Sequence, residues 1–188
     1  QILIKQYKKR KVSFLFLFVI ILGFVQHFPS LASSIGFGSL IGSVMLSMSM
    51  LGNVISKLFS GLIADIWGAI KATLIMVVIN LISLLTIFSV KSYILLEISS
   101  LMYGMMYSVI TVCLTLLSKE FYSDHEYNHY FPIISLVGGI SNALSTSVLG
   151  YVYDFSSSYY TVFFLLLALH IAGLLMILHM HYQKKKIH

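Results

Sequence analysis

Six long apolar runs most constrain what this chain can fold into. They lie at residues 13–31, 38–63, 71–90, 93–117, 131–153 and 159–181. A helix needs about 20 residues to cross a hydrocarbon layer, and each run is about that long. Backbone groups in lipid must bond within their own segment or close a barrel, and these runs lack the alternation of strands. We therefore predict an all-α integral membrane protein with six transmembrane helices.

The composition agrees with a membrane protein and argues against other classes. Of 188 residues, 59% are hydrophobic and 10% are charged, and the mean hydropathy is +0.94, too apolar for a soluble globule of this size. The single cysteine, Cys113, excludes an intramolecular disulfide and a metal site built from several cysteines. The net charge of +6 could indicate nucleic acid, but the basic residues flank the apolar runs. We expect membrane lipids, and not nucleic acid, as partners.

The basic residues predict the orientation of the spans. If the N-terminus is cytoplasmic, ten basic residues fall inside, only Lys91 falls outside, and Lys57 lies within a span. The ten are Lys5, Lys8, Lys9, Arg10, Lys11, Lys71, Lys119, Lys184, Lys185 and Lys186. We therefore expect a multi-pass protein of the plasma membrane with both termini in the cytoplasm.

The predicted organisation is a basic linker at residues 1–12, a helical bundle at 13–181 and a basic tail at 182–188. The first apolar run continues past Val25 with bulky residues, unlike a signal peptide with its small-residue cleavage site. Since the chain begins at Gln1, already inside the basic segment, we expect it to be a piece of a longer protein.

The bundle contains an internal repeat. Gly61-x-x-x-Asp65 ends the second run, and Gly150-x-x-x-Asp154 ends the fifth, 154 − 65 = 89 residues later. Because three spans separate the copies, the bundle divides into two three-helix units, which have opposite orientations in the membrane. We place them at residues 13–90 and 91–181. Inverted repeats of this kind occur in many secondary transporters.

The first copy extends into Gly61-x-x-x-Asp65-x-x-Gly68-x-x-Lys71, which resembles the signature loop of the major facilitator superfamily between helices eight and nine. Gly150-Tyr-Val-Tyr-Asp154, followed by Ser158-Tyr159, is similar to the end of helix eleven in its monocarboxylate-transporter-like and oxalate/formate-antiporter-like branches. The resemblance implies the C-terminal six-helix half of a twelve-helix transporter, with a missing N-terminal half as partner. Ile66 departs from the pattern, because family members usually have a basic residue there.

The resemblance implies a gating role for Gly61, Asp65, Gly68 and Lys71, and the repeat extends this role to the second copy, Gly150 and Asp154. A carboxylate favours the unpaired amides at a helix N-terminus by about 0.3–1 kcal/mol. We expect Asp65 to face the start of the fifth helix near Phe131-Pro132. The alternative is that Asp65 merely caps a helix and Lys71 merely anchors it on the cytoplasmic side.

Lys57 is the main candidate for binding a solute. It lies eight residues before Asp65, so it sits about 12 Å from the turn. A cation at that depth is costly unless it finds a partner or lines a wet cavity. Asn53 lies one turn away on the same face. The resemblance implies that Lys57 pairs with a carboxylate on the substrate, and the alternative is a lysine that snorkels to the membrane surface.

Polar side chains form a stripe along the fourth helix, with a second small and polar face on the fifth. The fourth-helix stripe is Glu97, Ser100, Tyr103, Gly104, Tyr107, Thr111 and Thr115. We predict that Tyr103 and Tyr107 contact solute together with Asn142 of the fifth helix, although close helix packing also explains the latter. Glu97 and His170 are candidates for ion coupling. Their alternatives are an acid at the outer rim and a buried interhelical hydrogen bond.

We find no enzymatic motif and no phosphate-binding loop. His125 and His129, near Asp124 and Glu126, are interpreted as parts of a solvated loop, so no metal or cofactor is expected. The predicted function is secondary active transport of a small organic solute by alternating access, as a symporter or antiporter. The resemblance suggests a monocarboxylate. The alternative is a six-helix protein that acts as a dimeric channel or as a non-transporting scaffold.

Overall fold

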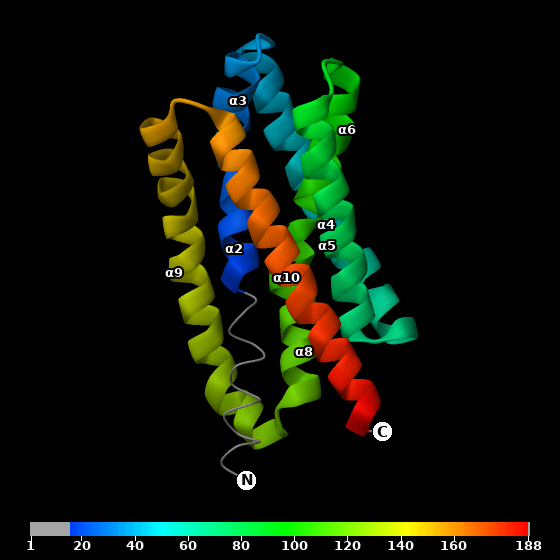
Figure 1. Ribbon diagram of the computed structural model, residues 1–188. Helices are drawn as coiled ribbons and strands as arrows, with labels where there is room; N and C mark the ends of the chain where they lie inside the picture. Colours follow the sequence, from blue (N-terminus) through cyan, green and yellow to red (C-terminus); the bar gives the residue numbers. More distant parts are fainter. Residues whose placement is uncertain (1–15, 188) are drawn as a thin grey trace.

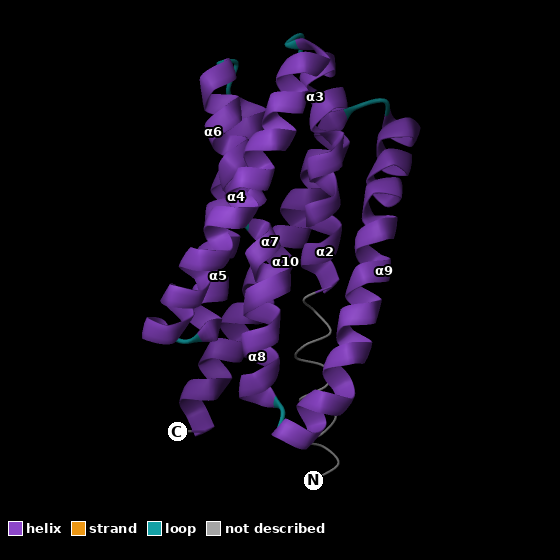
Figure 2. Ribbon diagram, turned by 180° about the vertical axis from the view of Figure 1, so that it is seen from behind, coloured by secondary structure: helices purple, strands orange, loops and turns teal. Residues whose placement is uncertain are grey.

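The computed structural model describes residues 16–187, and this part of the chain is helical without any strand (Figures 1 and 2). Within it, five helices are long and apolar enough to cross a membrane, and a shorter apolar helix spans Val19–Ser34. The five are Gly38–Trp67, Ala69–Ser89, Tyr93–Glu120, Asp124–Ser156 and Tyr159–His179. The predicted all-α membrane bundle with six spans is therefore confirmed.

The first span is interrupted part of the way along. α2 (Phe16–Gly23) passes into a 3₁₀ turn, η1 (Phe24–His27), and then into α3 (Phe28–Ser34). Pro29 stands in the first turn of α3, where its missing N–H costs no helical hydrogen bond. The chain then reverses into α4 (Gly38–Trp67), which turns into α5 (Ala69–Ser89). We call the end of the bundle with the α4–α5 turn the lower end, as in Figure 1, and the opposite end the upper end.

The fourth span is also irregular, although the sequence predicted one continuous helix. It consists of α6 (Tyr93–Gly104), α7 (Met106–Ser108), the π-helical turn η2 (Val109–Cys113) and α8 (Leu114–Phe121). A π turn holds one residue more than an α turn, so this span is not one regular α-helix.

The fifth span begins earlier than predicted. α9 (Asp124–Ser156) starts at Asp124 and not at residue 131, and the expected loop at 118–130 shrinks to two residues between α8 and α9. The cause is a capping box, in which the Ser123 and Glu126 side chains satisfy free amides at the helix start. Pro132, read as a mark of the helix start, lies inside α9.

The last span is longer than predicted. α10 (Tyr159–Ile187) continues through residues 182–187, which the sequence analysis assigned to a tail. Ser157, at φ 51°, ends α9 and allows the short upper connection to α10 that Figure 1 shows. The predicted linker at residues 1–12 lies outside the described residues.

α4 and α6 cross at close range. A Cβ on Gly52 would overlap the backbone oxygen of Leu101, and a Cβ on Gly104 would overlap the backbone oxygen of Ser49. Only glycine fits both positions. Lipid supplies no hydrophobic drive for helices to associate, so close backbone approach of this kind is a main source of packing energy in membranes.

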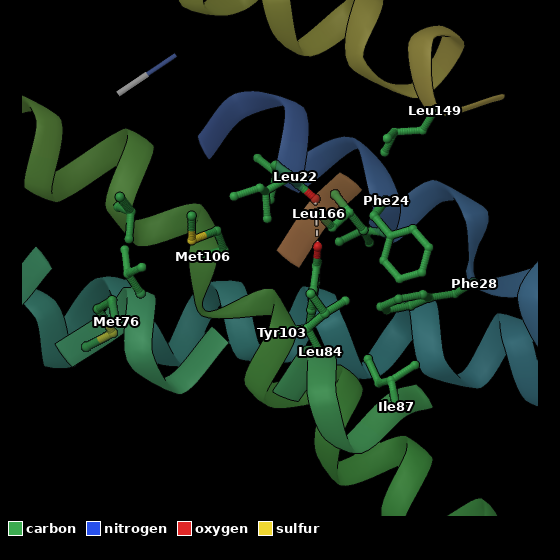
Figure 3. Packing of buried hydrophobic residues seen from close by; sticks show 14 of the residues in the cluster. Leu22, Phe24, Phe28, Met76, Leu84, Ile87, Tyr103, Met106, Leu149 and Leu166 are labelled. Carbon is green, nitrogen blue, oxygen red and sulfur yellow. Dashed lines mark hydrogen bonds between the residues drawn. The ribbon is translucent and has the colours of Figure 1, made fainter. Parts of the chain in front are cut away.

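The core is centred on Tyr103 of α6, which is fully buried (Figure 3). Its hydroxyl donates a hydrogen bond of 2.8 Å to the backbone oxygen of Ile21 in α2. The rings of Phe24 and Phe28 each lie 5.7 Å from the Tyr103 ring in edge-on geometry. Tyr103 therefore joins the fourth span to the first through both polar and aromatic contacts.

A buried polar chain extends this connection to α5 and α10. The Asn80 amide nitrogen donates to the Tyr103 backbone oxygen at 2.7 Å, which leaves its Oδ1 to accept from His170 Nε2 at 2.6 Å. The second ring nitrogen of His170 lies 2.8 Å from the backbone oxygen of Leu166. Asn80 and His170 are both 0% exposed. Four spans are thus connected through one chain of hydrogen bonds.

We expect Asn80→Leu to lower the free energy of unfolding by about 1–3 kcal/mol, because it leaves the buried His170 nitrogen without its acceptor. Thermal unfolding of the purified protein in detergent measures this change. Thr86→Val is the matched control, since the Thr86 hydroxyl bonds only to the Ile82 backbone oxygen of its own helix. Equal unfolding temperatures for the two variants would contradict a stabilising role for this chain of hydrogen bonds.

Candidate solute groove and lower turn

A cavity of about 350 Å³ lies between the fourth span and α9. We call it the solute groove. Its lining residues are Leu22, Tyr107, Ile110, Thr111, Leu114, Thr115, Phe131, Ile134, Ser135, Gly138, Gly139 and Asn142. Figure 1 shows α9 at the edge of the bundle, with α2 and α8 beside it.

Helical spacing explains how these side chains meet. The α9 members recur at alternating spacings of three residues and one residue between Phe131 and Asn142, so they follow one face over about 16 Å. The fourth-span members follow the same rule between Tyr107 and Thr115. Since the two helices run in opposite directions, Tyr107 and Asn142 lie toward the middle of the bundle, and Thr115 and Phe131 lie toward its lower end.

Several polar side chains line the groove. The side chains of Tyr107, Ser135 and Asn142 make no hydrogen bond to another described residue. The Thr111 hydroxyl donates to the Tyr107 backbone oxygen at 2.9 Å and keeps its own lone pairs as acceptors. The lining contains no formally charged residue, so this wall offers hydrogen bonds and apolar contact to a solute.

Two of the predicted solute contacts, Tyr107 and Asn142, are brought together here, and three are not. Tyr103 is buried in the core, with its hydroxyl bonded to Ile21, so it has no surface to offer a solute. Lys57 and Asn53 lie on α4, which packs against η2 but does not line the groove. The Lys57 side chain is exposed and makes no ion pair with a described residue, whereas Asn53 Oδ1 is buried without a hydrogen-bond partner.

The two candidates for ion coupling also lie outside the groove. His170 is held in the core by Asn80 and Leu166. Glu97 is half-buried in α6 near the upper end. The geometry at His170 is that of the predicted alternative, a buried hydrogen bond between helices.

The second Gly-x-x-x-Asp copy lies at the upper end of α9. The His27 ring packs beside Gly150, 3.7 Å from where a Cβ would stand, and its Nε2 lies 3.0 Å from the Thr146 backbone oxygen. Asp154 is exposed. Gly150 therefore makes room for a contact that joins η1 to α9.

The first copy forms the lower turn between α4 and α5. Gly68 adopts φ 86° and ψ 157°, a conformation that is open essentially to glycine alone. Asp65 and Lys71 are exposed, and a Cβ on Gly61 would meet no atom within 4 Å. The sequence predicted this turn, but the backbone requires glycine only at Gly68 and not at Gly61.

The expected contact between Asp65 and the start of α9 is not formed. The α4–α5 turn and the start of α9 lie on opposite sides of α8 in both views (Figures 1 and 2), and the α9 start is capped by Ser123 and Glu126. A different acid serves the turn, because Glu120 Oε1 at the end of α8 accepts a hydrogen bond of 3.3 Å from the Ala69 amide.

Sequence reasoning missed Glu120, although a signal was present. The helix dipole disfavours a carboxylate in the last turn of a helix, so an acid at this position suggests a favourable contact with another element. In this structure Glu120 faces the N-terminus of α5, where negative charge is favoured. The contact links the end of the fourth span to the turn.

Aromatic side chains gather where α8 meets α9. Tyr127 stacks on Phe131 with ring centroids 4.8 Å apart, and Lys119 Nζ lies 5.7 Å from the Tyr127 centroid. Burial, together with the neighbouring Glu126 carboxylate and Tyr130, raises the pKa of Tyr122 in the connection. The lower end of the groove is therefore bounded by a packed aromatic cluster.

A helical membrane bundle with a polar groove along one span is typical of solute transporters. A model of the Major Facilitator Superfamily matches residues 12–187 of this chain. The chain belongs to that superfamily, whose members carry out membrane transport. A search of curated proteins finds no match.

We expect Gly68→Ala to lower the free energy of unfolding by about 1–3 kcal/mol, because alanine is strained at the φ and ψ of this position. Gly61→Ala is the matched control, since it lies in a helix with open space around it, and we expect it to be neutral or slightly stabilising. Thermal unfolding in detergent compares the two. A larger loss in Gly61→Ala than in Gly68→Ala would contradict this account of the turn.

Proposed function

We propose that this chain is the C-terminal half of a secondary active transporter that moves a small organic solute, with a monocarboxylate as the first candidate. The observation that carries the proposal is the solute groove, in which the side chains of Tyr107, Ser135 and Asn142 have no hydrogen-bond partner among the described residues. A polar face of this kind is unfavourable toward lipid, so it suits a path for a polar solute.

The extent of the groove along the bundle supports a proposal of alternating access. It extends from the middle of the bundle to its lower end, so a solute bound near Tyr107 and Asn142 has a route to that side. We propose that the lower end is cytoplasmic, which agrees with the excess of basic residues at the predicted cytoplasmic ends of the spans. An N-terminal six-helix half would supply the opposite wall of the path in the plasma membrane, and coupling would make the protein a symporter or antiporter.

Lys57 supports a carboxylate as the solute. Its side chain is exposed and has no ion-pair partner among the described residues, although it lies about 12 Å from the lower turn along α4. α4 packs against the π turn that supplies Thr111 to the groove. Lys57 thus stands on a helix that packs against the span lining the groove, and we propose it as the partner for an anionic group on the solute.

The lower turn supports a gating role. Asp65 is exposed and its side chain makes no hydrogen bond or ion pair with a described residue, so it is available to a helix end outside the described part of the chain. The Glu120 contact with Ala69 holds the turn to the fourth span, which also lines the groove. A movement of the fourth span would therefore move the turn with it.

We expect Lys57→Ala to raise the KM for labelled short monocarboxylates by about 10- to 100-fold, the loss of one hydrogen bond to a charged group. Uptake by the full-length protein in proteoliposomes measures this. Lys91→Ala removes an exposed lysine outside the groove and should leave the KM unchanged. Equal KM values for Lys57→Ala and wild type would reduce Lys57 to a surface anchor. If folded wild-type protein takes up none of these acids into proteoliposomes, the monocarboxylate proposal fails.

We expect Asp65→Asn to slow uptake by about two- to five-fold without changing solute binding, because the amide loses the attraction to a helix N-terminus in one transport state. The uptake rate and the solute-induced rise in unfolding temperature separate the two effects. Asp124→Asn is the control, as it also removes an exposed carboxylate at the same end of the bundle. Wild-type uptake rates in Asp65→Asn would argue against gating.

A further inference from the structure

A second cavity, of about 260 Å³, lies at the upper end of the bundle, and we call it the upper pocket. It is bounded by the ends of α3, α5 and α9 and by the start of α10. Figures 1 and 2 both show the α9–α10 connection beside α3 at this end. No residue of its lining belongs to the solute groove. The proposed transport function therefore leaves the upper pocket unexplained.

The floor of the upper pocket is mostly apolar and closely packed. Leu31, Ile87 and Tyr159 are the most deeply buried residues of the lining, at 1%, 2% and 6% exposed. The Tyr159 ring is stacked on the ring of Tyr153, with centroids 4.3 Å apart. These contacts hold the floor in place before any ligand arrives, which lowers the entropic cost of binding against it.

The rim of the upper pocket is polar. The hydroxyl groups of Ser89, Tyr153 and Tyr160 make no hydrogen bond to another described residue. The Ser158 hydroxyl oxygen accepts a hydrogen bond of 3.2 Å from the Tyr160 amide, so its own proton is available to a ligand. Several hydroxyl donors around one cavity suit a ligand group with several acceptor oxygens.

Among the described residues that line the upper pocket, Lys91 is the only charged one. It stands in the connection between α5 and α6, where its neighbours Val90 and Ser92 have extended backbones. Its side chain is exposed and forms no ion pair with a described residue. Asp154 of α9 is exposed and does not line the pocket. One available cation among hydroxyl donors is a set of groups that suits a phosphate.

The length of α5 places Lys91 at the level of the lipid headgroups. α5 has 21 residues and is therefore about 30 Å long, which equals the thickness of the hydrocarbon layer. Lys91 follows the last residue of this helix, Ser89, by two positions. Tyrosines such as Tyr153 and Tyr160 are typical of the same membrane interface.

Apolar side chains continue downward from the rim on two helices. On α5, Leu85 lies one turn below Ser89 and is 42% exposed. On α10, Phe164 lies one turn below Tyr160 and is 64% exposed. α5 and α10 pack against each other, so these exposed faces are neighbours below the pocket. They suit the acyl chains of a molecule whose polar group occupies the rim.

We propose that the upper pocket binds a phosphate group and that this group belongs to a membrane phospholipid. Lys91 neutralises the phosphate, Ser89 and Tyr160 donate to its oxygens, and the acyl chains lie on the exposed faces of α5 and α10. A free phosphate ester has the same polar group but gains nothing from these apolar faces. The inference stands apart from the proposed transport function, because the upper pocket and the solute groove share no residue.

Three probes separate the phosphate from the chains in titrations of the full-length protein in detergent. They are dioleoylphosphatidylglycerol, dioleoylglycerol, which has the same chains without phosphate, and glycerol 3-phosphate, which has no chains. Native mass spectrometry and the rise in unfolding temperature measure binding. We expect the Kd for dioleoylphosphatidylglycerol to be about 10-fold or more lower than that for either other probe, since it alone contacts both the rim and the apolar faces.

Lys91→Gln removes the charge at the rim, and we expect it to raise the Kd for dioleoylphosphatidylglycerol by about 10-fold or more. Lys71→Gln is the matched control, an exposed lysine at the lower end, and its Kd should stay within about two-fold of wild type. Tyr160→Phe loses only a hydroxyl group and should raise the Kd by about two- to five-fold. Tyr151→Phe, exposed on α9 outside the lining, should leave it unchanged. Unfolding temperatures without lipid check that all four variants are folded.

The outcomes separate the phosphate from the lipid. Equal Kd values for dioleoylphosphatidylglycerol in wild type and folded Lys91→Gln, or equal values for the two dioleoyl probes in wild type, would overturn the phosphate site. If glycerol 3-phosphate binds as tightly as the phospholipid and its binding is lost in Lys91→Gln, the lipid is overturned and a site for a soluble phosphate ester remains. None of these measurements uses solute uptake, so the proposed transport function is tested separately.

Discussion

The hydrogen bond from Asn80 to the Tyr103 backbone oxygen is the contact on which the arrangement of four spans depends. In lipid, apolar side chains gain little by meeting each other, so helices need polar bonds and close backbone approach to select one arrangement. Tyr103 supplies both, since it lies next to Gly104 at the crossing with α4 and donates its hydroxyl to the first span. His170 then attaches α10 through Asn80.

This rigid cluster gives the groove its asymmetry. One wall, with Tyr107 and Thr111, belongs to the fourth span, which is fixed to the cluster just above. The other wall is α9, which has few buried residues and contacts the first span more than the fourth. A groove between a buried wall and a more exposed one can change its width without loss of the core contacts.

The sequence predicted the class, the six spans and the turn at Gly68, because lipid imposes length and polarity rules that can be read one span at a time. It predicted Tyr107 and Asn142 at one site, but it also placed Tyr103 there. That error has a physical cause. Regular helical spacing puts Tyr103, Tyr107 and Thr111 on one face, whereas the break near Met105 separates Tyr103 in the core from the other two in the groove. The Glu120 contact depends on tertiary proximity, which spacing along one helix cannot give.

The π turn of the fourth span has a consequence for which side chains the lower part of this span turns toward α9. It stores one extra residue within an otherwise α-helical segment. Conversion of that turn to α geometry would shift the lower part of the span by about 1.5 Å and rotate it by about 100°. Thr115 and its neighbours would then turn away from α9 while α6 stayed fixed at its crossing with α4. In the two geometries a single span would thus present different side chains to α9, without unfolding and without moving the core.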